Sequence, residues 1–213
     1  MSGVYLGLAA GPIVRVPAHV SVVTFFADER PLRGGAAHAD WRMCGALSRL
    51  IARGRLTGGF GEAALVPATG GVRARWLLAL GLGRCEEFSA ARSREIAGAC
   101  VTRALDLAAE VVALPLPPAG PDDPGREARL ELLLLALAAA APRDRQVRVR
   151  LVASDADEHA VLEELLRVRS RGPQRAGLTI DLPTRPPRSR YRSPAGSTGA
   201  SGAGHPEAGL RVK

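Results

Sequence analysis

Two glycines that follow an apolar run are the first residues whose type and spacing could do chemistry. Gly81 and Gly83 come directly after the run 76–80, and Ser89 stands where a helical pattern begins. Glycines between a strand and a helix let backbone N–H groups approach an anion. Gly81, Gly83 and Ser89 are therefore the candidate ligand-binding residues. The dinucleotide pattern GxGxxG fails at Glu86, however, and a tight turn is the favoured interpretation of the same glycines.

A second glycine-rich loop, 57–62, has the core GGFGE and could line a pocket or form sharp turns. Asp28 and Glu29 are adjacent carboxylates without an acid–base partner, which favours a solvated turn. The histidines are scattered and form no HExxH pattern, and the cysteines are widely spaced and form no CxxC pattern. These residues are His19, His38, His159, His205, Cys44, Cys85 and Cys100. We therefore predict no catalytic residue and no metal ligand.

Length and composition are those of one domain of ordinary size with a tail. Of the 213 residues, 46% are hydrophobic and only 4% are aromatic, so Leu, Val and Ala must fill the core. The formal net charge is +8, but residues 171–213 hold seven arginines and Lys213 against Asp181 and Glu207. The rest of the chain is nearly neutral, which argues against nucleic acid as a partner. Binding through the arginines of 188–192 is the alternative.

Membrane and redox signals point to one compartment. The longest apolar run, 130–141, is interrupted by Glu131 and is too short to span a bilayer. No basic segment precedes the short apolar stretch at the N-terminus, so no signal peptide is expected. Widely spaced cysteines in odd number favour reduced thiols, and Cys44 is expected to be buried on an apolar helix face. We expect a cytoplasmic protein.

Apolar runs of strand length alternate with helical periodicity, which predicts an α/β fold. Strands are expected at 13–16, 20–26, 63–67, 76–80, 111–116 and 147–151, the last toward the sheet edge. Helices are expected at 39–53 and 89–110, and the first of them should bury Trp41, Cys44 and Leu47 on one face. A third helix should begin at an N-cap at Asp123, and a fourth at a capping box formed by Asp155 and Glu158. Buried stripes are expected to include Leu130, Leu133, Leu134 and Leu137, then Val161, Leu162, Leu165 and Leu166.

The periodicity ends near Arg171, which divides the chain into a domain, 1–170, and a linker and tail, 171–213. Residues 193–204 are rich in Ser, Gly and Ala and are expected to be disordered, because they cannot bury enough apolar surface to offset the entropy of ordering.

The sequence between Asp40 and Gly83 is similar to that of the N-terminal domain of leucine aminopeptidases. It comprises GALS-x-L followed by RG, a G-x-x-GE loop, and a strand ending in GLG. DLPTRPP at 181–187 resembles the family's linker, with Thr184 where the family usually has Asn. The resemblance implies a macro-domain-like fold, a mixed sheet flanked by helices on both faces.

In that family a second, larger domain holds two divalent metals, such as zinc or manganese, through a lysine, several aspartates and a glutamate. Those residues are missing here, where the only lysine is Lys213. A two-metal site needs several such ligands, so the chain is expected to bind no cofactor and to be non-catalytic by itself.

The role that follows is interaction or assembly, with itself or a separate aminopeptidase subunit. The alternative is a small-molecule module for ADP-ribose-type ligands. The pattern stops after Pro187, which leaves two alternatives. Either a frameshift or broken gene truncates the product, so that another reading frame encodes the metal-binding domain, or the chain is a true short protein with a disordered tail.

Overall fold

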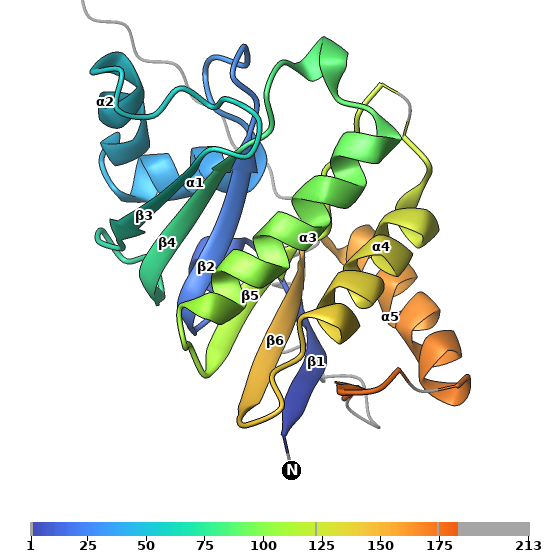
Figure 1. Ribbon diagram of the computed structural model, residues 1–213. Coiled ribbons are helices and arrows are strands. Elements are labelled where there is room, and N and C mark those ends of the chain that lie inside the picture. Colours follow the sequence, from blue (N-terminus) through green and yellow to red (C-terminus); the bar gives the residue numbers. More distant parts are fainter. Residues whose placement is uncertain (1, 122, 174, 183–213) are drawn as a thin grey trace, which may run out of the picture. The chain divides into compact units, whose positions relative to one another are not determined.

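The computed structural model describes residues 2–121, 123–173 and 175–182. Within them the strands form a seven-stranded sheet in the order β3-β4-β2-β5-β6-β1-β7 (Figure 1). The strands are β1 (Gly3–Ala10), β2 (Ala18–Phe25), β3 (Ala63–Pro67), β4 (Ala74–Gly81), β5 (Val111–Pro115), β6 (Gln146–Ala153) and β7 (Leu178–Ile180). All neighbours are parallel except β3, which pairs antiparallel with β4 at one edge. The expected mixed sheet is confirmed.

Helices cover both faces of this sheet, which confirms the three-layer α/β expectation (Figure 1). On one face lie α1 (Gly34–Arg42) and α2 (Ala46–Ala52). On the other lie α3 (Ala90–Asp106), α4 (Arg126–Ala139) and α5 (Ala156–Arg171). Two 3-10 turns, η1 (Ile13–Arg15) and η2 (Cys85–Glu87), complete the elements. Two apolar cores result, one on each face, built mainly from Leu, Val and Ala as the composition predicts.

The central strands agree best with the sequence. β2, β4 and β5 are buried on both faces, so each appears in the sequence as a continuous apolar run. Ser89 is the N-cap of α3, its Oγ accepting from Arg92 N at 3.3 Å. Asp155 caps α5 by accepting from Glu158 N at 2.8 Å. The four leucines expected on the buried stripe of α4 are all buried.

The N-terminal expectation is wrong. Ile13–Arg15 form the η1 turn and not a strand, with Pro12 as the N-cap and Val16 as the C-cap. The first strand is β1, which was not predicted from the sequence and which pairs in parallel with β6 and β7 on either side. Glycines at positions 3 and 7 interrupt its apolar pattern. β6 is consequently an inner strand and not near the edge, although its arginines alternate as a solvated face would.

The helix expected at 39–53 is broken into α1 and α2. Cys44 and Gly45 adopt positive φ values of 53° and 80°, and Gly45 N donates to Asp40 O at 2.8 Å, which ends α1. The Asp40 carboxylate then accepts from Ser48 N at 3.0 Å and caps the first turn of α2. The break turns Trp41 outward, where it is 77% exposed, and leaves Cys44 exposed as well. The predicted buried positions of Trp41 and Cys44 are therefore wrong, whereas Leu47 is buried.

Two smaller expectations also need correction. The N-cap of α4 is Gly125 and not Asp123, whose carboxylate accepts from Gly125 N at 3.1 Å and lies 3.0 Å from Arg129 Nε. Val161, expected on the buried stripe of α5, is 39% exposed.

The compact unit spans Met1–Leu182, beyond the boundary placed at 170. β7 belongs to it, since Leu178 is buried and Asp181 N donates to Leu6 O at 2.8 Å. The predicted disorder of 193–204 and most of the linker match lie outside the described residues. In the described ranges, no helix is both long and apolar enough to cross a membrane.

The place of β7 predicts a difference between two truncations. A chain ending at Leu182 should unfold with the same midpoint as the full chain, because it keeps the whole sheet. A chain ending at residue 170 should lose about 2 kcal/mol or more, since burial of one leucine side chain alone is worth about that much. Urea unfolding followed by circular dichroism measures both. Equal stability of the two truncations would contradict a structural role for β7.

Candidate functional site

The candidate glycines lie where β2 and β4 end, at the carboxyl edge of the sheet. Gly83 O accepts from Ala27 N at 2.8 Å, which joins the loops after these two strands. Gly83 N donates to Gly58 O at 2.9 Å, which adds the loop 57–62 that precedes β3. The structure therefore brings both glycine-rich segments of the sequence together. The carboxyl edge of parallel strands is where α/β sheets generally bind ligands.

Gly81 is fixed by close packing. A Cβ at this position would lie 2.3 Å from Gly59 O and 2.5 Å from Gly58 C. Both distances are shorter than the contacts that Cβ atoms make in folded proteins. Its N–H donates to Glu62 O at 2.8 Å, and its carbonyl accepts from Gly61 N at 3.0 Å. A residue without a side chain is thus required for the loop 57–62 to lie against the end of β4.

Gly83 and Ser89 also have their backbone or side-chain groups engaged within the protein. Gly83 has a φ of +75°, which favours glycine, and its N–H already has an acceptor. The Ser89 hydroxyl oxygen serves the first turn of α3. The ligand-binding role of Gly81, Gly83 and Ser89 therefore stays a prediction, and an anion here would have to find donors other than the N–H groups of the two glycines.

Glu62, for which the sequence predicts no role of its own, places its carboxylate where the backbone donors of the loop converge. Glu62 Oε2 accepts from Gly58 N at 2.7 Å, Thr57 Oγ1 at 2.8 Å, Thr57 N at 2.9 Å and Gly59 N at 3.2 Å. Successive N–H groups that converge in this way form an anion-binding concavity. The loop's own glutamate fills the position that a bound anion would take. The signal in the sequence is the glutamate that follows Gly61 directly.

These hydrogen bonds set the ionisation of Glu62. Partial burial on its own raises the pKa of the carboxyl, but the bonds from Thr57, Gly58 and Gly59 outweigh it, so the pKa lies below the ordinary 4.5. The charged carboxylate is therefore the form that holds the loop.

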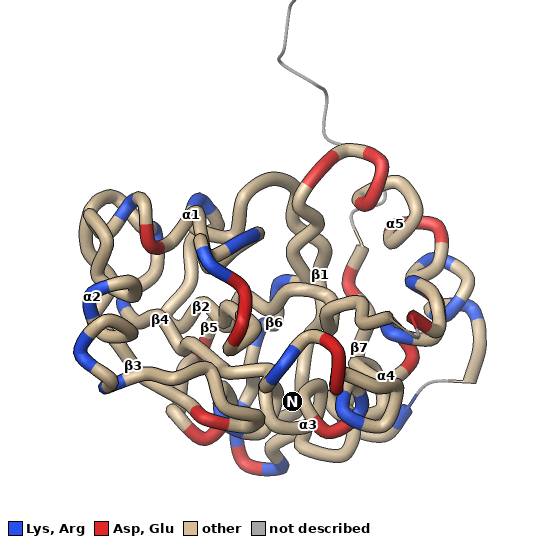
Figure 2. Tube along the Cα trace, turned by 90° about the horizontal axis from the view of Figure 1, so that it is seen from above, with Lys and Arg blue, Asp and Glu red and all other residues tan. Residues whose placement is uncertain are grey.

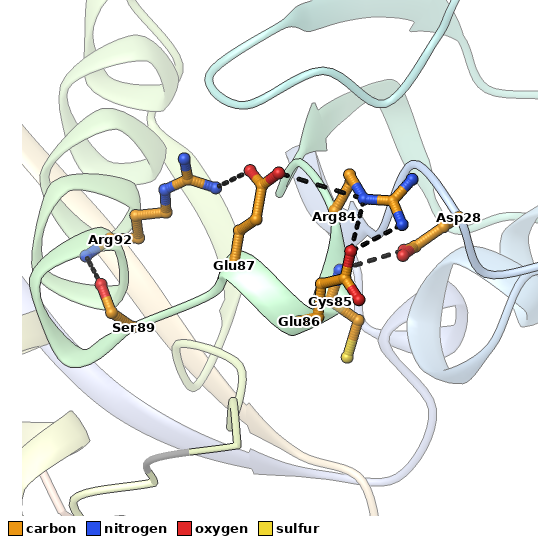
Figure 3. A network of polar contacts seen from close by, with 7 residues as sticks. All are labelled: Asp28, Arg84, Cys85, Glu86, Glu87, Ser89 and Arg92. Carbon is orange, nitrogen blue, oxygen red and sulfur yellow. Dashed lines mark hydrogen bonds and ion pairs between the residues drawn. The ribbon is translucent and has the colours of Figure 1, made fainter.

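Ion pairs tie the loop after β4 to its surroundings (Figure 3). Asp28 accepts from Cys85 N at 3.0 Å and so links the loops that follow β2 and β4. Arg84 pairs with Glu86 at 2.6 Å, and Glu87 pairs with Arg92 at 2.9 Å. These charges neutralise one another along the surface and hold the start of α3.

Two arginines of α3 reach the glycine-rich loop. The Arg92 guanidinium lies 4.9 Å from the centre of the Phe60 ring, a cation–π distance. Arg103 Nη1 donates to Gly61 O at 2.6 Å. The loop 57–62 is consequently fixed from β4 and from α3 together.

The remaining candidates form no joint site in the described part of the chain. His19 Nδ1 accepts from the backbone, and His159 lies 3.8 Å from Glu163. Burial raises the pKa of the Cys100 thiol to about 12, so it behaves as an apolar group. No group of three or more His, Cys, Asp or Glu among residues 2–121, 123–173 and 175–182 is placed to hold a metal ion. Basic and acidic positions are interspersed around the domain (Figure 2). His205 and the arginines of 188–192 lie outside the described residues.

Solved structures with this arrangement define the class of fold. The macrodomain of Thermus aquaticus DarG has a TM-score of 0.53 at 18% identity, over 70% of this chain and 99% of its own. The Oceanobacillus iheyensis macrodomain with ADP has a TM-score of 0.56 at 12% identity, over 75% and 88%. A mutant tomato leucine aminopeptidase has a TM-score of 0.54 at 10% identity, over 78% of this chain but only 36% of its own. At these identities the likeness shows a shared macrodomain-like α/β fold and nothing more.

The sequence identifies the family within that class. The profile of the cytosol aminopeptidase family, N-terminal domain, matches residues 22–148, which is more than half of the chain. The chain belongs to this family, and the resemblance noted between Asp40 and Gly83 is confirmed. No curated protein sequence matches it significantly.

Replacement of the glutamate tests the role of its charge. Glu62→Gln should destabilise the domain at pH 7 by about 1–2 kcal/mol, because a charged acceptor of several hydrogen bonds is lost from a partly exposed site. The folded pKa is depressed, so the contribution of the ionised carboxylate is complete at neutral pH. It disappears as the pH falls through the folded pKa, below 4.5, where the stabilities of wild type and variant should converge.

Urea unfolding at pH 7 and at acid pH measures this difference. Glu95→Gln, on the exposed surface of α3, is the matched control and should change stability little at either pH. A pH-independent difference between wild type and Glu62→Gln would show that the carboxylate's charge does not hold the loop.

Proposed function

We propose that this domain is non-catalytic by itself and serves in assembly, with a metal-dependent aminopeptidase subunit as its partner. The observation that carries the proposal is Trp41, which is 77% exposed on α1. It borders the Trp41 hollow, about 520 Å³ in volume, whose lining includes Pro31, Leu32, Ala37 and Cys44. An exposed aromatic side chain beside an apolar depression is typical of the centre of a protein–protein interface.

Family membership supports the choice of partner. The matched profile describes an N-terminal domain, and the tomato enzyme extends well beyond the part that this chain covers. The metals of the family's reaction would be held by the partner, since the metal-binding lysine, aspartates and glutamate that the resemblance leads one to expect are missing from this sequence. A cytoplasmic location fits a cytosol aminopeptidase and the unpaired cysteines.

The carboxyl edge of the sheet favours the same role. The amides of Thr57, Gly58 and Gly59 are used by Glu62, and the N–H groups of Gly81 and Gly83 are used by neighbouring loops. A loop that satisfies its own donors makes a rigid scaffold, whereas a phosphate site needs those donors available.

Association is tested by removing the exposed ring. Trp41→Ala should weaken binding to a purified leucine aminopeptidase catalytic domain by about 30-fold or more, the usual consequence of truncating a central aromatic. Leu135→Ala is the control, because Leu135 is 50% exposed but lies on α4, across the sheet. Sedimentation velocity of the mixture, and of the chain alone, measures the association. Equal binding by Trp41→Ala and wild type would contradict the proposal, and a Trp41-dependent homodimer would replace the subunit partner with a second copy.

The absence of activity in the isolated chain is tested directly. The purified chain should not hydrolyse leucine p-nitroanilide with either manganese or zinc. Metal-dependent turnover that co-purifies with the chain and is unaffected by Trp41→Ala would overturn the non-catalytic assignment.

A second candidate is the binding of an ADP-ribose-type ligand, which the fold shared with the Oceanobacillus iheyensis macrodomain with ADP favours. Calorimetry with ADP and with ADP-ribose separates it from the scaffold role. Because the glycine-loop donors are engaged, we expect no heat of binding at millimolar ligand. A saturable heat that Glu62→Gln strengthens would instead support ligand binding, since the variant removes the competing carboxylate.

A further inference from the structure

The opposite, amino edge of the sheet carries a second hollow that none of these roles uses. It has a volume of about 280 Å³ and lies where β2, β4 and β5 begin. Its apolar lining includes Leu65, Trp76 and Leu107, and its polar lining includes His19, Arg75 and Glu110. None of these residues lines the Trp41 hollow. We call this second depression the Trp76 hollow.

The apolar side of the Trp76 hollow is open to solvent. Leu65, on the edge strand β3, is 42% exposed, and Leu107, which ends α3, is 38% exposed. Trp76 of β4 is half-buried beside them. Two leucines and a tryptophan thus line a concave site. Its volume, nearly 300 Å³, is close to the lower size limit of small-molecule pockets.

The polar side offers one cation, one anion and one neutral donor. His19 Nδ1 accepts from Glu110 N at 3.2 Å and Val111 N at 3.3 Å, so the ring proton sits on Nε2, which is free to donate. Neither Arg75 nor Glu110 has an ion-pair partner in the described part of the chain. A separate positive and negative charge beside an apolar wall complement a zwitterion with an apolar side chain.

We propose that the Trp76 hollow binds a free apolar α-amino acid. The ligand carboxylate pairs with the guanidinium of Arg75 and accepts from His19 Nε2, and its ammonium group pairs with the carboxylate of Glu110. The ligand side chain packs against Leu65, Trp76 and Leu107. Charge-assisted hydrogen bonds at both ends distinguish such a ligand from a simple hydrocarbon.

Fluorescence provides the binding assay because the chain has only two tryptophans, Trp41 and Trp76. In a Trp41→Phe background, Trp76 is the sole tryptophan and reports on the hollow itself. Titration with leucine should change its emission saturably. Isocaproate lacks the ammonium group and isoamylamine lacks the carboxylate, so each should bind about tenfold more weakly than leucine, the loss expected for one hydrogen-bonded charge.

Two variants assign the charges. Arg75→Gln should weaken leucine binding about tenfold but leave isoamylamine unaffected, since that ligand has no carboxylate to lose. Glu110→Gln should weaken leucine about tenfold but leave isocaproate unaffected. Arg73→Gln is the matched control, because Arg73 is an exposed arginine two residues away that does not line the hollow. All three positions are exposed, so the variants should keep the parent unfolding midpoint.

The proposal is overturned by any of three results. Emission of Trp76 that does not change up to the solubility limit of leucine would exclude the site. Equal affinity for leucine, isocaproate and isoamylamine would reduce it to an unselective apolar depression. Equal losses in Arg73→Gln and Arg75→Gln would reassign the effect to general surface charge. Each result is independent of Trp41 and therefore of the assembly role.

Discussion

The Glu62 carboxylate within its own loop is the interaction on which the carboxyl edge of this domain depends. Four donors converge on one oxygen, and the loop so closed presents its backbone to the end of β4. Gly81 must then lack a side chain, because a Cβ there would lie 2.3 Å from the carbonyl oxygen of Gly59. The hydrogen bond from Arg103 of α3 to Gly61 O depends on the same geometry, since it reaches a backbone whose conformation Glu62 stabilises.

This interaction explains why the glycines could be recognised in the sequence but not their role. Glycines that bind a phosphate and glycines that permit close packing look the same in an amino-acid sequence. The difference lies in whether an internal acceptor reaches the converging N–H groups, and that depends on the turn after Gly61, a matter of backbone geometry. Glu62 appears in the sequence as one more charged residue at the start of a strand. Its hydrogen bonds, and the low pKa they cause, become visible only in three dimensions.

The strands that are most completely buried are the ones that the sequence predicts best. β2, β4 and β5 have neighbours on both sides and helices on both faces, so their apolar runs identify them without further information. β1 is also internal, but its glycines interrupt the run. β6 alternates arginines with apolar residues as an edge strand would, and yet strand order places it inside. The break at Cys44 and Gly45 is accompanied by a hydrogen bond from Ser48 N to the Asp40 carboxylate, a contact that helical periodicity does not predict.

The few aromatic residues divide between core and surface in a way that bears on binding. Phe25, Phe26 and Phe88 are buried, while leucine, valine and alanine fill most of both cores. Both tryptophans, by contrast, border hollows, Trp41 on the α1 and α2 face and Trp76 at the amino edge. Trp76 packs partly against the larger core, whereas the 77% exposed ring of Trp41 contributes little to packing within the domain. An exposed tryptophan ring beside an apolar depression is typical of a binding surface, and this is the basis of the proposed assembly role.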